Sequence, residues 1–226
     1  MLPLRDNIEA ERRPWVNRTL IAVNVLAFMY ELSLGPLLPA FFHDHGLPPA
    51  TVLSPDAWSI SWVDQVDRLF VHMFLHGGWM HLIGNMWFLH IFGDNVEGRL
   101  GHGKYLVFYL GCGLAAASGQ VLSAPTSFVR IIGASGAVAG VLGAYLVLFP
   151  RARIFTLVPL FVFVQFIELP AVIFLGFWAL IQFFRGTAEL VGGATDGVAW
   201  WAHVAGFAAG AAFVFLRPRA ERARYR

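Results

Sequence analysis

The residues most able to do chemistry are a serine, two histidines and an asparagine that lie within apolar stretches. Ser135 stands in the sequence Gly-Ala-Ser-Gly, His203 stands in Ala-His-Val-Ala-Gly, and His81 precedes Asn85 by four residues. A serine hydroxyl is a weak nucleophile until a base removes its proton, and histidine is the usual base. Histidine and asparagine N–H groups can hold the negative oxygen that forms when a carbonyl is attacked. These residue types indicate acyl-transfer chemistry.

Each of these motifs also has a structural interpretation when it is taken alone. The small residues Gly133 and Gly136 beside Ser135 are typical of a helix-packing face, as are Gly206 and Gly210, which lie four apart on one helix face. A histidine in a membrane helix is as often a hydrogen-bonded structural residue as a catalytic one, and the pair of His81 and Asn85 could form an interhelical hydrogen bond. What favours catalysis is therefore their relative position.

The composition of the 226-residue chain indicates a polytopic membrane protein. Hydrophobic residues make up 58% of the sequence and charged residues 13%, and the mean hydropathy is +0.63. These values lie outside the range of soluble domains. The net charge is +2, but the basic residues stand at the ends of apolar runs rather than in patches, so they indicate membrane topology and no nucleic-acid binding. The single cysteine, Cys112, excludes an internal disulfide.

Six apolar runs are long enough to be spanning helices, which need about 20 apolar residues. They cover residues 18–35, 79–96, 104–123, 131–149, 169–186 and 198–216. We expect one six-span domain over residues 18–216, a cytoplasmic tail at 1–17 and a basic cytoplasmic tail at 217–226. This topology places 13 of the 16 Lys and Arg residues inside, and leaves three outside: Arg68, Arg130 and Arg185.

The segment 154–168 is the uncertain part of this topology. A seventh span there would put the five C-terminal arginines outside the membrane, against the positive-inside tendency. We therefore predict an interfacial or re-entrant connection with a bend at Pro159.

The topology also predicts that the reactive residues share one depth. The second, fourth and sixth spans run in the same direction, and Ser135, His203 and His81 each lie near the outer start of one of them. At about 1.5 Å per residue, all three lie within about 10 Å of the outer surface. We expect a Ser135–His203 dyad with an oxyanion site formed by the Ser135 N–H, His81 and Asn85. The sequence offers no obvious acid to orient His203.

With these residues in place, the chain resembles the rhomboid family of intramembrane serine proteases. The family's Gly-x-Ser-Gly motif matches residues 133–136, and its Ala-His-x-x-Gly-x-x-x-Gly motif matches residues 202–210. Its His-x-x-x-Asn pair matches His81 and Asn85, and its Gly-x-x-x-Glu-x-x-x-Gly pattern matches Gly93, Glu97 and Gly101. Beside the charged Arg99, Glu97 is expected to be a structural partner for loop groups.

The resemblance implies an all-α bundle of six transmembrane helices, a water-filled cavity open to the outside, substrate entry past the fifth helix, and no cofactor. The implied partners are the lipid bilayer and single-span membrane proteins, which would be cut after a small residue, and the implied location is a bacterial inner membrane. One departure concerns a tyrosine that some members carry four residues after the serine, where this chain has Ala139. The group that orients His203 is therefore unassigned.

Three alternative interpretations of the sequence are a metal site, a silent client-binding protein and a transporter. His72 and His76 are spaced as a metal-binding pair would be, but no carboxylate or cysteine accompanies them at ligand spacing, so we expect no metal. A catalytically silent rhomboid-like protein that binds membrane clients is the main rival function, although such proteins usually lack the serine or the histidine. A small transporter would carry inverted repeats or charges at mid-bilayer, and the sequence has neither.

Overall fold

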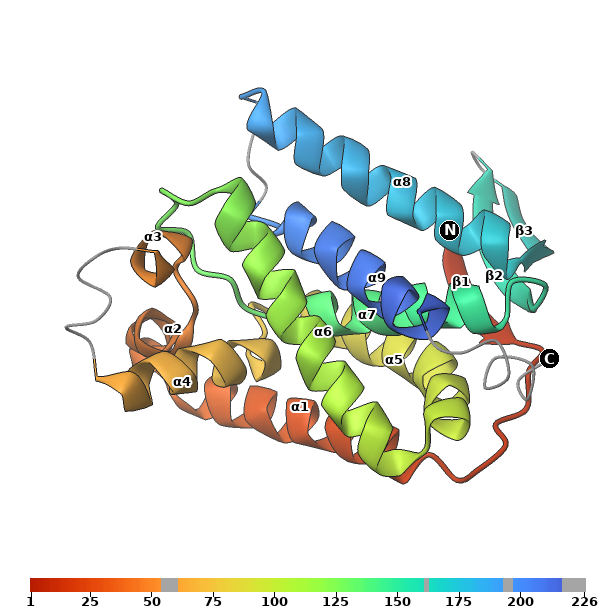
Figure 1. Ribbon diagram of the computed structural model, residues 1–226, viewed down its shortest axis with the longest axis horizontal. Helices are drawn as coiled ribbons and strands as arrows, with labels where there is room; N and C mark the ends of the chain where they lie inside the picture. The colour runs from red at the N-terminus through yellow and green to blue at the C-terminus, as the bar shows by residue number, and fades with distance from the viewer. Residues whose placement is uncertain (54–60, 161–162, 193–196, 217–226) are drawn as a thin grey trace.

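The computed structural model describes residues 1–53, 61–160, 163–192 and 197–216. It is mostly helical, with a small β-sheet at one end, near which the N-terminus lies (Figure 1). The helices are α1 (Trp15–Ser33), α2 (Leu38–His45), α3 (Pro49–Val52), α4 (Trp62–Val71), α5 (Trp79–Leu100), α6 (His102–Ser123), α7 (Ser135–Leu148), α8 (Ala171–Leu190) and α9 (Trp200–Phe215), with 3-10 turns at Gly35–Leu37 and His72–Phe74. The strands are β1 (Leu2–Asp6), β2 (Arg153–Leu160) and β3 (Phe163–Pro170).

Helix α7 forms the centre of the bundle, and α5, α6 and α9 pack around it (Figure 1). Eleven of its 14 residues are buried. The close packing follows from its glycines, because a side chain at Gly136 would overlap Ala116 of α6 and one at Gly140 would overlap Cys112. Small residues let helix backbones approach one another where no water supplies a hydrophobic driving force.

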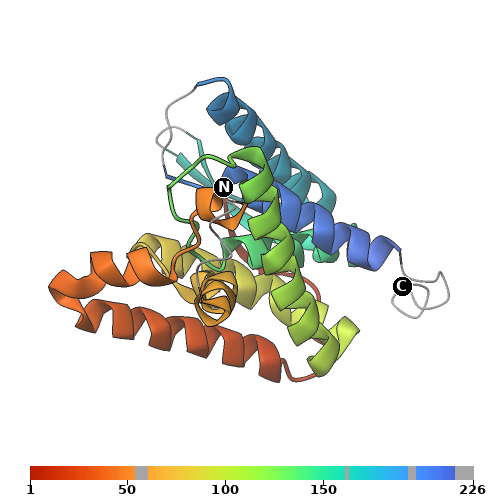
Figure 2. The ribbon, with the colours of Figure 1, turned by 60° about the vertical axis from the view of Figure 1, so that its left-hand side comes forward.

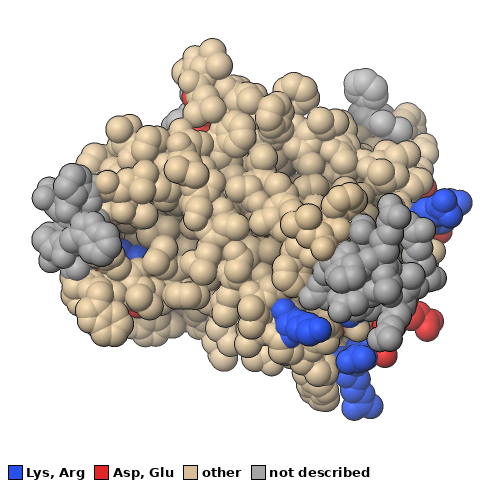
Figure 3. Space-filling model, viewed as in Figure 1, with Lys and Arg blue, Asp and Glu red and all other residues tan. Residues whose placement is uncertain are grey.

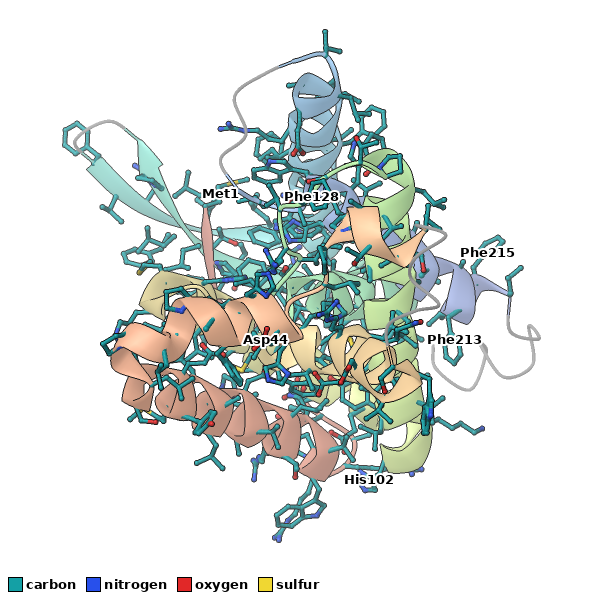
Figure 4. All side chains as sticks on the ribbon, turned by 90° about the vertical axis from the view of Figure 1, so that its left-hand side faces the viewer. Met1, Asp44, His102, Phe128, Phe213 and Phe215 are labelled. Carbon is teal, nitrogen blue, oxygen red and sulfur yellow. The ribbon has the colours of Figure 1, made fainter. Side chains whose placement is uncertain are left out.

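The segment 153–170 forms a β-hairpin, which corrects two expectations. The fold is not purely α-helical, because β2 pairs antiparallel with both β1 and β3 in a three-stranded sheet. Pro159 does not bend an apolar segment; it lies within β2 opposite Val164 of β3. The run of β-branched and aromatic residues from Ile154 to Val158 favours a strand. Figure 4 shows the hairpin projecting away from the helices.

Helices α8 and α6 are the two helices of the described residues that are long and apolar enough to cross a membrane singly. A third candidate is the pair formed by α1 and residues 35–45, which is bent by 106°, so that α2 runs steeply across the direction of α1 (Figure 1), and Figure 2 shows the turn between them from another side. Each of the six predicted runs contains a helix, but α7 and α9 are shorter than predicted, with 14 and 16 residues. Two helices of the described residues, or three with the bent pair, are thus long and apolar enough to span, so the count of six spans stays a prediction.

Charged side chains are unevenly placed on the surface. In the space-filling view they gather mainly at the end of the molecule that holds the sheet, while the middle is almost free of them (Figure 3). Many exposed side chains of α8 and α6 are apolar, including Val172, Phe177 and Phe184 of α8 and Val107 of α6. Such a surface suits a hydrocarbon solvent.

Glu97 ties the start of α1 to the end of α5. Its carboxylate is fully buried and accepts hydrogen bonds from the backbone N–H groups of Val16 (2.9 Å) and Asn17 (2.6 Å), and it contacts His102 Nδ1 at 2.5 Å. The first N–H groups of a helix lack intrahelical acceptors. The Glu97 carboxylate on α5 is the acceptor for two such N–H groups at the start of α1.

Replacing Glu97 with alanine is expected to lower the free energy of unfolding by about 3 kcal/mol, because two buried N–H groups lose a charged acceptor. The measurement is unfolding of the purified protein by heat or by sodium dodecyl sulfate. Glu11→Ala is the matched control: Glu11 also pairs with a cation, Arg99 at 2.7 Å, but its side chain is 49% exposed. Glu11→Ala should lower the free energy of unfolding by less than about 1 kcal/mol. An equal loss of stability in the two variants would contradict the capping role of Glu97.

Candidate active site

Three helices begin at the same cavity and bring the predicted residues together. Ser135 is the first residue of α7, His81 is the third of α5 and His203 is the fourth of α9. All three line a cavity of about 560 Å³, together with Asn85 of α5. The N–H groups of a first helical turn have no intrahelical acceptor and carry partial positive charge, so this end of the bundle favours a negative oxygen.

The serine hydroxyl lies beside the histidine ring. Ser135 Oγ is 2.8 Å from His203 Nε2, which is hydrogen-bonding distance. Ser135 begins α7 because residues 131–134 do not continue the helix: Ile131 forms a β-bridge with Leu47, and Gly133 has φ +118°, a conformation that glycine adopts readily. The helix thus begins four residues after the start of the predicted span at residue 131.

The other ring nitrogen of His203 contacts a residue that the sequence did not single out. His203 Nδ1 is 2.8 Å from Oε1 of Gln182, which lies on α8. The rings of Trp178 and Trp200 also lie near this imidazole, with centroids 6.1 and 5.9 Å away. Gln182 could have been found from the sequence as a polar residue within the apolar run 169–186, where such residues need a partner.

His81 is packed against the glycine that precedes the serine. A side chain at Gly133 would lie 2.6 Å from His81 Cε1 and Nε2, so glycine is required there for space as well as for its dihedral angle. The backbone N–H of Gly77 donates to His81 Nδ1 at 3.4 Å. Since a neutral imidazole carries one proton, this bond leaves the proton on Nε2, the nitrogen that faces Gly133. His81 is therefore arranged as a donor.

Asn85 contributes a second free donor. Its side chain is 7% exposed and lines the cavity, and its Nδ2 atom has no hydrogen-bond partner among the described residues. A buried amide without a partner costs free energy in the resting protein. A group that accepts a hydrogen bond inside the cavity would remove that cost.

The glycines of α9 set the distance between the two reactive helices. A side chain at Gly206 would overlap the carbonyl oxygen of Gly136, and one at Gly210 would overlap that of Gly140. The backbones of α7 and α9 are thus in direct contact one turn below Ser135 and His203. This contact positions the serine against the histidine.

His72 and His76 lie close to this cavity in the outer loop, and both are almost completely buried. Burial lowers the pKa of each imidazole to about 4. Among the described residues, no three histidine, cysteine, aspartate or glutamate side chains cluster as a metal site would require.

These two histidines predict a pH-dependent stability. Their folded pKa values lie below the ordinary value of 6.5, so at these two positions the unfolded chain binds more protons between pH 4 and 6.5. The two histidines therefore contribute stability that rises with pH across this window, by at most about 1.4 kcal/mol per pH unit for each group. Unfolding measured from pH 4.5 to 7 tests this. Replacing both residues with asparagine should make the slope of stability against pH less positive, and an unchanged slope in that double variant would contradict the assignment to these histidines.

Comparison with known proteins agrees with this arrangement. The family model described as the Rhomboid domain matches residues 63–220, more than half of the chain. A protein of Bacillus subtilis (strain 168) named "Putative rhomboid protease YdcA" is 35% identical over 79 residues, which are 35% of this chain. The match covers 39% of that relative's length. With its apolar helices, the chain is a multi-pass membrane protein, and it belongs to the rhomboid family.

Proposed function

We propose that this protein is an intramembrane serine endopeptidase that cuts the transmembrane segments of single-span membrane proteins. The observation that carries the proposal is the 2.8 Å contact between Ser135 Oγ and His203 Nε2 at a cavity within the helix bundle. The family match points to a membrane protease, and the serine mechanism rests on these two residues.

In the proposed reaction, Ser135 Oγ attacks the scissile carbonyl while His203 Nε2 takes the hydroxyl proton. The tetrahedral oxygen is held by the Ser135 backbone N–H, Asn85 Nδ2 and His81 Nε2–H. His203 then gives its proton to the leaving amine, and the peptide bond breaks to leave an acyl-enzyme. Water then attacks the ester carbonyl while His203 Nε2 takes its proton, and as the acid product leaves, His203 gives that proton to Ser135 Oγ.

The short helices support a site below the membrane surface. At about 1.5 Å per residue, the 14 residues of α7 extend about 21 Å, against about 30 Å for the hydrocarbon core. If its C-terminal end reaches the inner interface, Ser135 lies about 10 Å below the outer one. Non-helical backbone such as residues 131–134 is tolerated at that depth where it lines a water-filled cavity.

The proposed topology has six spans formed by α1, α5, α6, α7, α8 and α9, with both termini in the cytoplasm of a bacterial cell. It keeps the domain at residues 18–216 between the tails 1–17 and 217–226, of which the second lies outside the described residues. The sheet, formed by β1 and the hairpin between α7 and α8, would lie at the cytoplasmic end. Small residues beside the cavity, Gly113, Ala116 and Ala117, suit a small side chain before the cut.

Reconstituted protein provides the test. Purified protein in liposomes should cut a model single-span substrate, and mass spectrometry of the products should place the cut within the spanning segment. A fluorophosphonate, which reacts with activated serines, should modify Ser135 and leave Ser118 unmodified, since the exposed Ser118 hydroxyl on α6 donates to the backbone oxygen of Leu114 and not to a base. If folded protein binds such substrates but cuts none and Ser135 does not react, the client-binding alternative holds.

The oxyanion role of Asn85 gives a further prediction. Asn85→Ala removes one donor to the tetrahedral oxygen and should lower kcat about 100-fold while changing KM little. Steady-state cleavage in detergent measures both constants. Ile83→Ala, at a half-exposed position on the same helix, should retain kcat. Full activity of Asn85→Ala would remove this residue from the mechanism.

A further inference from the structure

The outer half of α8 carries one buried polar side chain that faces the candidate site. Most of α8 is exposed at the apolar surface, and the buried residues are Ala171, Phe174, Leu175, Gln182 and Gly186. Gln182 is the single polar side chain among them and is 6% exposed. Placing an amide in an apolar helix costs free energy unless both its ends are hydrogen-bonded. The contacts of this amide therefore indicate what it does.

Both ends of the Gln182 amide have partners, and these fix its orientation. The Nε2 atom donates to the backbone oxygen of Trp178 at 3.2 Å, one turn earlier in α8. Exchanging the nitrogen and oxygen would set two carbonyl oxygens against each other. The Oε1 atom must therefore face His203 Nδ1, 2.8 Å away, as an acceptor.

This orientation determines the protonation of the histidine. Because Oε1 can only accept, His203 carries its proton on Nδ1, which leaves Nε2 as the unprotonated nitrogen beside Ser135 Oγ. Only that tautomer can remove the serine proton. The same bond also fixes the ring plane, for which Ala139 provides no aromatic support on α7.

We propose that Gln182 is a positioning residue that holds His203 in the tautomer and orientation needed to activate Ser135. The proposal rests on the proposed protease function. Gln182 acts through the histidine and does not touch the reacting atoms, and as a neutral group it orients the ring without adding a charge to the membrane interior. Because the amide belongs to α8 and the ring to α9, the alignment of the dyad depends on how α8 packs on α9.

A second contact holds the two helices at the same level. Trp201 Nε1 of α9 donates to the backbone oxygen of Gly186 at 3.1 Å, and a side chain at Gly186 would lie 3.1 Å from the Trp201 ring. Gln182 lies one turn from Gly186 on the same face of α8. The outer end of α8 is thus fixed to α9 where the Gln182–His203 bond forms.

Three variants separate positioning from packing. Gln182→Met keeps the length of the side chain but removes the acceptor, and should lower kcat about 10- to 100-fold with little change in KM. Gln182→Glu restores an acceptor and should recover at least about a third of the wild-type kcat. The control is Gln120→Met: Gln120 is also buried, but it bonds the backbone N–H of Ala202 rather than the imidazole, so kcat should stay within about threefold.

Nitrogen-15 NMR of histidine-labelled protein gives a readout that a structural role would not change. The wild-type spectrum should show His203 protonated on Nδ1, and Gln182→Met should show a mixture of the two neutral tautomers. The proposal is overturned if the proton of wild-type His203 lies on Nε2. It is also overturned if Gln182→Met keeps the wild-type kcat, or if its kcat falls no further than that of Gln120→Met. If Ser135→Ala still cuts, it is the protease function that fails, whatever the tautomer.

Discussion

Replacing Ser135 with alanine should abolish cleavage of a single-span substrate, lowering kcat/KM by at least about 10⁴-fold. The hydroxyl is the only nucleophile within reach of His203 Nε2 in the described cavity, so the acyl-enzyme cannot form without it. His203→Ala should cause a loss of similar size, because the hydroxyl keeps its proton. Since the two residues act as one unit, the double variant should be no less active than either single variant.

The measurement is the rate of product formation in liposomes, with folding verified by thermal unfolding. Ser118→Ala is the matched control, because it removes a serine hydroxyl from a spanning helix away from the cavity, and it should keep wild-type activity. Cleavage that persists in Ser135→Ala would show that another group is the nucleophile. Losses in the single variants that multiply in the double variant would show that the two residues act separately.

Replacing Gly210 with leucine should prevent recovery of folded protein. A side chain at Gly210 would overlap the carbonyl oxygen of Gly140 and lie 2.5 and 2.7 Å from its carbonyl carbon and Cα. All three are backbone atoms of α7. No side-chain rotation can relieve the overlap, so the two helices must move apart. Overpacking typically costs about 1–3 kcal/mol where side chains can yield, and here the clash is with backbone and the added group is a whole isobutyl chain. Since α9 also carries His203, separation would move the histidine away from the serine.

Gly111→Leu on α6 is the matched control for this change. A side chain at Gly111 meets no heavy atom within 4 Å, so leucine there should be tolerated and should raise helix propensity by up to about 1 kcal/mol. Yield of monodisperse protein and resistance to sodium dodecyl sulfate measure both variants. Equal stability of the two variants would mean that α7 and α9 do not pack through Gly140 and Gly210.

The fold family could be predicted from the sequence because its signals are local. Apolar runs bounded by charges mark helices whatever the rest of the chain does, and each of the six predicted runs contains one. The small residues at Gly136, Gly206 and Gly210 indicated close packing, and the structure places all three between helix backbones. The motifs around Ser135 and His203 indicated a pair of reactive groups, and the structure places Ser135 Oγ 2.8 Å from His203 Nε2.

The sequence does not predict the hairpin at 153–170, since β2 pairs on one side with the neighbouring β3 but on the other with a strand far along the chain. Read by itself, the apolar segment from Ile154 fits a short interfacial helix as well as a strand, and periodicity cannot decide between them. β2 is covered on one side by β1, about 150 residues earlier in the sequence, through pairs such as Thr156 with Pro3. Strand pairing satisfies backbone groups only when that distant segment is present.

The sequence by itself determined the membrane character, the approximate helices and the residue types that can do acyl-transfer chemistry, because these follow from composition and spacing. Only the tertiary structure decided that Ser135 begins its helix, that the Asn85 amide nitrogen has no partner in the described part of the chain, and that Gln182 of α8 contacts His203 of α9. The physical reason is that a hydrogen bond between helices requires a distance within a few tenths of an ångström, and spacing along one chain cannot supply it.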